Sequence, residues 1–171
     1  MKKEYEENGR NGMEFLIFSD SHGKRKAVAE AISRQIRTPD AIFYLGDGLA
    51  DIGDRYEGIP VIRVRGNCDW RFPEEPAKDL ELLSFEGHRL LLTHGHLYGA
   101  KSGFGGLLAA AKEFGADLVL FGHTHRQELL TFPGENGERP VYLFNPGSIA
   151  AGDFGTLRLE KNLVLFAHGS L

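Results

Sequence analysis

The chain has 171 residues, a formal net charge of −4 and one cysteine. This length suits one domain with a substantial core. The acidic balance offers no basic footprint for nucleic acid or anionic membranes, and no apolar run is long enough to span a bilayer. The polar start, MKKEYEENGRNG, lacks the apolar segment of a signal peptide. A single cysteine, Cys68, excludes an internal disulfide and suits a reducing compartment, so we expect a cytoplasmic protein.

The N-terminal residues 1–12 are rich in charge and poor in apolar side chains, so we expect a disordered tail there. Met13 is a candidate alternative start. No linker divides the rest of the chain, and residues 13–171 are therefore predicted to form a single domain.

The first half of the chain alternates strands with helices. Short apolar runs at 15–19, 41–46 and 61–66 predict buried strands. Between the first two, a helix is predicted from Lys24 to Arg37, ended by the sequence TPD. Its apolar residues recur at helical spacing: Ala27, Val28, Ala31, Ile32 and Ile36. A short helix is expected from Gly48 to Tyr56, and the resulting β-α-β-α-β order indicates a largely parallel sheet.

The second half of the chain is richer in strands. Residues 80–94 predict two strands around the turn sequence EGH. A helix is predicted from Gly105 to Phe114, ended by Gly115. Further strands are predicted at 118–122, 127–132, 141–145, 154–160 and 163–168. Together the two halves predict two packed sheets with helices outside.

Five of the apolar runs end in side chains that can bind metal ions. These are Asp20 and His22, Asp47, Asn67 with Cys68 and Asp69, His94 and His96, and His123 and His125. Sites in open α/β sheets lie just beyond the carboxyl ends of the strands, so we expect these residues to converge. Three of the pairs are spaced i, i+2, and in extended chain such pairs point the same way.

The residue types favour a metal site. Imidazole suits zinc, iron and manganese, while carboxylate and carboxamide oxygens suit harder ions such as manganese and magnesium. One thiol cannot build a cysteine-rich structural zinc site. There are more donors than one tetrahedral ion needs, which favours two ions. The alternative is structural: Asp20 or Ser21 could cap the helix at Lys24, and the glycines could be turn residues.

The motif order DSH, GD, GNCD, HGH and GHTH resembles that of the calcineurin-like metallophosphoesterases, from Met13 to the C-terminus. The short length, the cysteine in GNCD and the sequence NPGS at 145–148 look most similar to the small stand-alone YfcE-type phosphodiesterase subgroup. The resemblance implies an α/β fold, a four-layer α-β-β-α sandwich of two mixed sheets flanked by helices. It also implies a two-metal centre, commonly manganese in this subgroup; zinc, iron, nickel or cobalt would also fit.

The resemblance implies a ligand set and a reaction. The matching positions are Asp20, His22 and His125 for the first ion, Asn67, His94 and His123 for the second, and Asp47 as the bridge. Two such ions can hold a hydroxide between them and clamp the oxygens of an in-line displacement at phosphorus. The expected activity is metal-dependent hydrolysis of a small phosphodiester.

Cys68 departs from the larger family, in which many members have a histidine after the asparagine that assists the leaving group. A thiol of ordinary pKa is a poor substitute for imidazolium at neutral pH, so we expect better activity on esters with good leaving groups. The resemblance to the subgroup implies a preference for diesters. His96 could donate the proton instead, or could orient the phosphate by a hydrogen bond. Asp69 is expected to support the ligands from behind. Cys68 could also be only a small packed residue.

Other residues have weaker signals. The glycine-rich segment at 99–106 lacks the residue order of a P-loop. Its Lys101 could contact a phosphate or be a solvated lysine. Arg126 could reach the substrate or form a surface ion pair.

Two other functions stay open. Relatives such as the retromer subunit use this fold as a scaffold and tend to have lost a ligand, whereas this chain has all seven ligand positions. Phosphomonoesterase activity is disfavoured by Cys68. The C-terminal hairpin could supply the edge of a homo-oligomer.

Overall fold

The computed structural model describes residues 12–71, 77–134 and 137–171. Its helices are α1 (Arg25–Ser33) and α2 (Gly105–Phe114), with short 3₁₀ helices η1 (Leu49–Asp51), η2 (Asp69–Arg71), η3 (His96–Tyr98) and η4 (Ile149–Ala151). The strands of the first half are β1 (Met13–Phe18), β2 (Ala41–Tyr44), β3 (Arg55–Tyr56), β4 (Ile59–Arg63) and β5 (Leu80–Phe85). Those of the second half are β6 (His88–Thr93), β7 (Leu118–Leu120), β8 (Gln127–Phe132), β9 (Val141–Pro146), β10 (Asp153–Glu160) and β11 (Leu163–Ser170).

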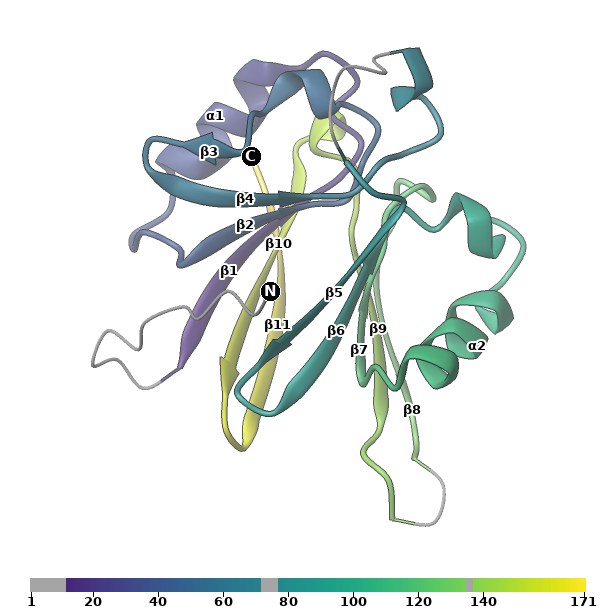
Figure 1. The fold of residues 1–171 in the computed structure, drawn as a ribbon. Coiled ribbons are helices and arrows are strands. Elements are labelled where there is room, and N and C mark those ends of the chain that lie inside the picture. Colours follow the sequence, from purple (N-terminus) through teal and green to yellow (C-terminus); the bar gives the residue numbers. More distant parts are fainter. Residues whose placement is uncertain (1–11, 72–76, 135–136) are drawn as a thin grey trace.

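The strands form two mixed sheets that lie beside each other in Figure 1. The first has the order β11-β10-β1-β2-β4-β3, and the second has the order β5-β6-β7-β9-β8. Strands β1, β2 and β4 are parallel to one another, as are β6, β7 and β9. Each sheet thus has a parallel centre, and the antiparallel hairpins flank it.

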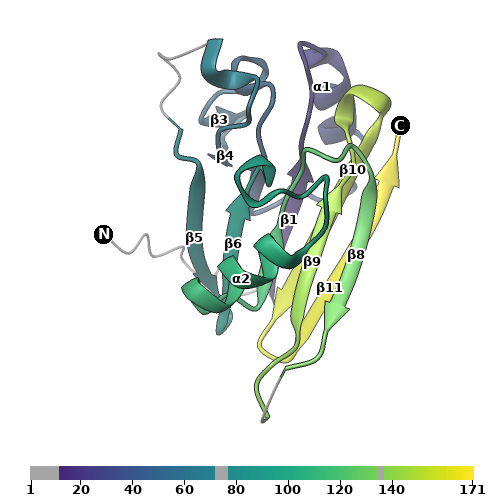
Figure 2. The same cartoon turned by 90° about the vertical axis from the view of Figure 1, so that its right-hand side faces the viewer.

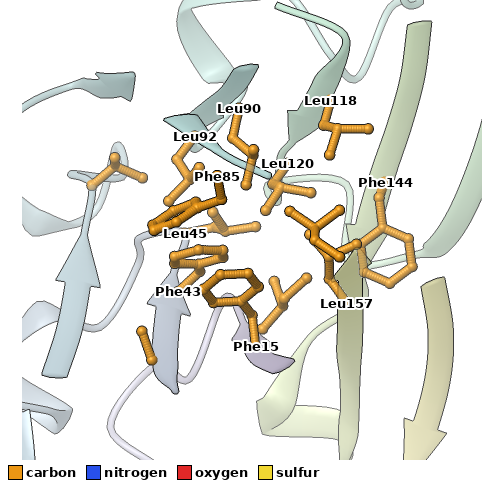
Figure 3. Packing of buried hydrophobic residues seen from close by; sticks show 14 residues of the cluster. Phe15, Phe43, Leu45, Phe85, Leu90, Leu92, Leu118, Leu120, Phe144 and Leu157 are labelled. Carbon is orange, nitrogen blue, oxygen red and sulfur yellow. The ribbon is translucent and has the colours of Figure 1, made fainter. Parts of the chain in front are cut away.

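The apolar side chains divide into three layers, which explains why the central strands are apolar on both faces. One cluster lies between the sheets, where Phe15 and Phe43 stack at 4.5 Å between ring centroids and meet side chains of the second sheet such as Leu90 (Figure 3). A second cluster joins the first sheet to α1, and a third joins the second sheet to α2. Figure 2 shows α2 in front of the second sheet. The expected four-layer α-β-β-α sandwich is therefore confirmed.

Two predicted helices are wrong in detail. The first helix ends at Ser33, so Ile36 falls beyond it and is fully exposed. The chain reverses there to reach β2, and Pro39 disfavours helix in the residue before it. The segment from Gly48 to Tyr56 forms the single turn η1 followed by β3, because Asp54 to Ile59 fold back as a hairpin onto β4. The order is thus β-α-β-β-β, with a 3₁₀ turn in place of the second helix.

The predicted tail at 1–12 lies outside the described residues except for Gly12. None of the helices in the described part of the chain is long and apolar enough to cross a bilayer.

The inter-sheet cluster gives the first prediction. Phe43→Ala should lower the free energy of unfolding by about 3–5 kcal/mol, because a fully buried ring stacked on Phe15 is replaced by a cavity. Ile36→Ala is the control, and its fully exposed side chain should contribute within about 0.5 kcal/mol. Urea unfolding of the two variants measures both values. Equal stabilities would contradict the placement of the core between the sheets.

Candidate metal centre

The predicted ligands follow the carboxyl ends of the parallel strands. Asp20 follows β1, Asp47 follows β2 and Asn67 follows β4 in the first sheet, while His94 follows β6 and His123 follows β7 in the second. Since these strands are parallel within each sheet, their ends meet at one edge of the sandwich (Figure 1). The convergence expected from the sequence is present in the structure.

Asp20 is the centre of this group and is completely buried. Its Oδ2 accepts hydrogen bonds from Ser19 Oγ at 2.5 Å and from the His123 backbone N–H at 3.1 Å. Its Oδ1 faces the Nε2 atoms of three imidazoles: His125 at 3.1 Å, His22 at 3.7 Å and His94 at 3.9 Å. Within the described residues Oδ1 has no hydrogen-bond partner. A buried carboxylate oxygen without a hydrogen-bond donor is costly, and a bound cation would offset that cost.

Asp47 connects an exposed and a buried half of the site. Its Oδ2 lies 3.4 Å from His94 Nε2, and its Oδ1 accepts the Cys68 N–H at 2.7 Å. Potential ligand atoms lie within 4.8 Å of one another in three groups: Asp20 with His22 and His125, Asp47 with His22 and Cys68, and Asp47 with Asp20 and His94. Burial alone would raise the pKa of Asp47, but the proximity and charge of His94 and the hydrogen bond from the Cys68 amide hold it well below its usual range.

His94 has one ring nitrogen committed and the other available. Its Nδ1–H donates to the Leu45 carbonyl at 2.6 Å, while its Nε2 is buried without a hydrogen-bond partner among the described residues. Burial would lower the pKa of His94, but the Asp47 carboxylate, 3.4 Å from Nε2, and the charge of Asp20 raise it. The pocket thus favours positive charge at Nε2. A divalent cation could replace that proton, so the residues present fit metal ions.

Two further imidazoles line the second half. The His123 ring lies 5.1 Å from that of His94 and 6.1 Å from that of His96. Burial, then the positive charges of His94 and Lys101, lower the pKa of His123 to about 4. Burial and the charge of His94 also lower the pKa of His96. Both rings are therefore neutral at pH 7, the form in which a nitrogen lone pair is available.

The paired residues are not in extended chain, so that explanation for their common direction is wrong. Asp20, His22, Asp47, His123 and His125 all have positive φ angles, between 46° and 68°. Such a left-handed conformation costs about 1–3 kcal/mol for a residue with a side chain. The side chains of each pair face the site because tight turns follow the strands, and a sequence pattern of period two does not reveal such turns.

Asp69 supports this site from behind. Its carboxylate is buried and accepts four backbone N–H groups. These belong to Asp47 and Gly66 at 2.8 Å on Oδ2, and to Gly48 at 2.8 Å and Leu49 at 3.0 Å on Oδ1. One carboxylate thereby fixes the loop that carries Asp47 to the loop that carries Asn67.

A second group of hydrogen bonds holds the loop after β1, and the sequence did not predict it. Ser21 Oγ forms hydrogen bonds with Tyr44 Oη and with Asp51, and Asp51 Oδ2 also accepts the Gly23 N–H at 2.7 Å. Burial raises the pKa of Tyr44. The sequence feature that could have predicted these hydrogen bonds is the single hydroxyl, that of Tyr44, in the otherwise apolar run AIFY. A buried tyrosine needs a hydrogen-bond partner.

The alternative role of Asp20 and Ser21 as helix caps is excluded. The N-cap of α1 is Lys24, and no side chain caps it. The NPGS turn lies against the site instead: Ser148 Oγ donates to the Asp20 carbonyl at 2.9 Å, and Asn145 Nδ2 donates to the Gly122 carbonyl at 2.9 Å.

The remaining predicted residues lie at the exposed side. Asn67 is exposed, and its described side-chain contact is to Cys68 Sγ at 3.4 Å, not to His94 or His123. Cys68 is also exposed, at the edge of the group with His22 and Asp47. Arg126 is exposed, and the described contact of its backbone is to Thr124 Oγ1 at 3.3 Å.

One protein-family domain matches nearly the whole described part of the chain. Residues 13–167 match the calcineurin-like phosphoesterase superfamily domain. The chain is 34% identical over 138 residues to the probable metallophosphoesterase YsnB of Bacillus subtilis, covering 80% of this chain and 75% of that protein. It is 30% identical over 162 residues to the phosphodiesterase YfcE of Escherichia coli K12, covering 81% of this chain and 80% of that protein.

Comparison with solved structures supports the same fold. The vacuolar protein sorting 29 structure from Cryptosporidium parvum superimposes with a TM-score of 0.69, covering 95% of this chain and 100% of that chain. Its sequence identity is only 16%, so this likeness concerns the fold alone.

The contact between two loops gives the second prediction. A Cβ atom at Gly66 would overlap the carboxylate and backbone nitrogen of Asp47, so Gly66→Ala must displace Asp47. We expect a loss of about 10- to 100-fold in affinity for divalent ions, the range found when support of a ligand is removed. Calorimetric titration with manganese measures the change.

Gly105→Ala is the matched control, because nothing lies within 4 Å of a Cβ there and the residue begins α2. It should bind metal like the unmodified chain. Unchanged affinity in Gly66→Ala, with the fold intact by circular dichroism, would contradict the role of Asp47 in metal binding.

Proposed function

Because the chain belongs to the calcineurin-like phosphoesterase superfamily, we propose that it is a metal-dependent phosphodiesterase with two divalent ions. One observation carries the proposal. Asp20 Oδ1 and His94 Nε2 are buried 3.9 Å apart without hydrogen-bond partners among the described residues. Native proteins rarely leave such groups unsatisfied, and a divalent cation satisfies both.

The proposed ligands follow the family motif. They are Asp20, His22 and His125 for one ion, Asn67, His94 and His123 for the other, and Asp47 between them. The grouping of Asp47 with His22 on one side and with His94 on the other supports a bridging position. For Asn67 the proposal requires its carboxamide to turn from Cys68 toward the site. Manganese is the proposed metal, with zinc, iron, nickel or cobalt as the alternatives.

The proposed chemistry divides between the ions and the chain. Two divalent ions, when bound by these residues, would supply an acidified water molecule and would neutralise charge on the phosphoryl oxygens. The chain keeps Asp47 ionised through its low pKa. It also fixes the tautomer of His94 through the Leu45 carbonyl and fixes the loop of Asp47 through Asp69. The left-handed turns therefore hold these charged groups in position before a substrate binds.

For His96 we propose an orienting role in preference to proton donation. Its ring is partly buried beside His94 and His123, and its Nδ1 has no hydrogen-bond partner in the described part of the chain. A neutral imidazole still has one N–H, which can donate to a phosphoryl oxygen. The lowered pKa of His96 makes it a hydrogen-bond donor at pH 7, not an acid that is already charged.

The proposed preference for good leaving groups rests on Cys68, and the proposed preference for diesters rests on the similarity to the phosphodiesterase YfcE. The side chain of Cys68 lies at the edge of the site, where it can face a leaving group. A thiol there gives little of the proton donation that an imidazolium would give. Lys101 is proposed to contact a phosphate, since its charge acts on His123, and Arg126 to reach substrate from the exposed loop.

A non-catalytic scaffold is the second candidate, because the vacuolar protein sorting 29 structure has the same fold. The full set of ligand positions favours catalysis. We also propose the cytoplasm as the location, since the one cysteine suits a reducing compartment. The edge strand β11 could pair with a second copy to form a homo-oligomer.

Hydrolysis assays test the proposed function. After the metals are stripped and manganese is added back, the protein should hydrolyse bis-p-nitrophenyl phosphate and show little activity on p-nitrophenyl phosphate. Both substrates release p-nitrophenolate, a good leaving group that needs no acid, so the expected preference for the diester rests on the similarity to the phosphodiesterase YfcE. Preference for the monoester would contradict the diesterase. No turnover with any divalent ion would favour the scaffold.

Removal of the proposed bridge is a separate test. Asp47→Ala should reduce kcat by about 100- to 1,000-fold, the order expected when electrostatic stabilisation of a transition state is removed. The fold should survive, because this carboxylate is outside the apolar clusters. Glu113→Ala, an exposed position in α2, is the control and should retain full activity. A fully active Asp47→Ala variant would exclude the two-metal mechanism.

A further inference from the structure

A second cavity lies at the end of the second sheet opposite to the candidate metal centre. It has a volume of about 590 Å³, is partly open to solvent, and is formed where the C-terminal half of α2 meets the ends of β6, β8 and β9. Cavities that hold small molecules in proteins range from about 300 to 1,000 Å³. Arg89 in this cavity and the proposed ligand His94 are separated by about 16 Å along β6. The cavity is therefore separate from the metal centre.

The floor of the cavity is apolar. Four apolar side chains from α2, β8 and β9 line it, namely Leu108, Ala111, Phe132 and Val141. All of them belong to the cluster that joins α2 to the second sheet, or pack against it. Leu108, Phe132 and Val141 are only half-buried, so part of their apolar surface stays in contact with water. An apolar group bound on this floor would remove that surface from water, which is favourable.

The acid at the base of the cavity, Asp117, is already paired. Its Oδ2 lies 2.6 Å from His88 Nδ1 and 3.6 Å from Arg139 Nη1, and its Oδ1 accepts the Arg89 backbone N–H at 2.7 Å. Arg139 also donates to the Gly87 carbonyl at 2.7 Å, which fixes its guanidinium at this edge. The charge of Asp117 is thus compensated within the protein, and it repels a bound anion less than an unpaired carboxylate would.

Two further cations of the cavity have no such partner. Arg89 and Lys112 are exposed, and among the described residues their side chains form no hydrogen bond or ion pair. The lining holds three cations and two acids, the second acid being Glu138, so it is positive on balance in a chain of net charge −4. The end of α2 does not present a bare carbonyl at Ala111, because that group accepts the Ala116 N–H at 2.8 Å. Arg89 and Lys112 are therefore available to an anion.

We propose that this cavity binds a small amphipathic anion, a carboxylate or phosphate attached to an apolar group. The apolar group lies on Leu108 and Phe132, and the anion lies between Arg89 and Lys112. The guanidinium of Arg89 can donate two parallel hydrogen bonds to either kind of anion, and the ammonium of Lys112 adds a second positive charge. This site is independent of the proposed phosphodiesterase function, because it uses none of the metal ligands.

A fluorescent anion tests the site in the full chain. The probe is 8-anilinonaphthalene-1-sulfonate, which fluoresces strongly on apolar protein surface. Its fluorescence should rise with the metal-free protein, and octanoate or octyl phosphate should displace it. Octylamine has the same tail and the opposite charge, and it should not. Octanoate should bind about tenfold more tightly than hexanoate, since each buried methylene improves affinity by about fourfold at full burial. The stronger of the two octyl anions identifies the preferred anionic group.

Charge variants locate the probe. The double variant Arg89→Gln with Lys112→Gln should lose at least about tenfold in affinity for octanoate, because charge-assisted hydrogen bonds are removed. The matched control is Lys26→Gln with Lys161→Gln, which loses the same charge at exposed positions of α1 and of the β10–β11 turn. It should bind octanoate like the unmodified chain. Glu138→Gln should strengthen binding several-fold, because it removes the unpaired acid of the lining.

Several outcomes would overturn the site. They are no rise in probe fluorescence, equal displacement by octanoate and octylamine, and equal affinities of the double variant and its control. Metal dependence separates this site from the candidate metal centre, which also attracts anions. Equal octanoate affinity with and without manganese supports the cavity, whereas binding that requires manganese would place the anion at the metal centre and overturn the proposal.

Discussion

The buried carboxylate of Asp20 is the constraint on which the rest of the site depends. It lies at zero exposure between two sheets, with one oxygen satisfied by Ser19 and a backbone amide, and the other facing imidazoles alone. Transfer of an unpaired charge from water into a protein interior costs several kcal/mol at least, so the fold is arranged around its compensation. The raised pKa of His94 has the same cause, because the acidic pocket stabilises positive charge at Nε2. A divalent cation meets this demand with more charge than a proton supplies.

The two-sheet architecture is what brings the compensating groups to Asp20. A single parallel sheet would deliver donors from one row of strand ends, whereas here β1, β2 and β4 face β6 and β7 across the apolar layer. The glycines directly before Asp47, Asn67 and His123 then let the loops approach one another. At Gly122 a Cβ would overlap Ser19 Oγ and come within 3.0 Å of Asp20 Oδ2, so any larger residue would separate the two sheets at the site. The cost of the left-handed turns is offset by the packing of the strands below them.

Most of the architecture was readable from the sequence, because both determinants are local. Continuous apolar runs such as AIFY predict doubly buried strands, and ligand-type residues directly after them predict a site at the strand ends. The extent of the first helix was not readable, since Ile36 has the correct spacing but the chain must turn at Ser33 to reach β2. The 3₁₀ turn after Gly48 is set by its tertiary contacts, above all the hydrogen bonds to Asp69. The cooperation of Ser21, Tyr44 and Asp51 likewise depends on residues far apart in the chain.

The site has a buried layer and an exposed layer, and this difference has a physical consequence for specificity. Asp20, Asp47 and His94 are buried and fixed, so in the proposed phosphodiesterase they would set what binds at the centre, namely cations and the phosphoryl oxygens these attract. Asn67, Cys68 and Trp70 lie on one exposed turn, which Asp69 fastens to the buried layer. Substitutions in that turn can change the groups on the phosphate that the protein accepts, because they do not alter the charges below. Conversely, loss of the Asp69 carboxylate would remove the hydrogen bonds that hold the exposed turn to the loop of Asp47. In the proposed phosphodiesterase, one buried layer would therefore serve different phosphoesters, with Asp69 holding the exposed turn to that layer.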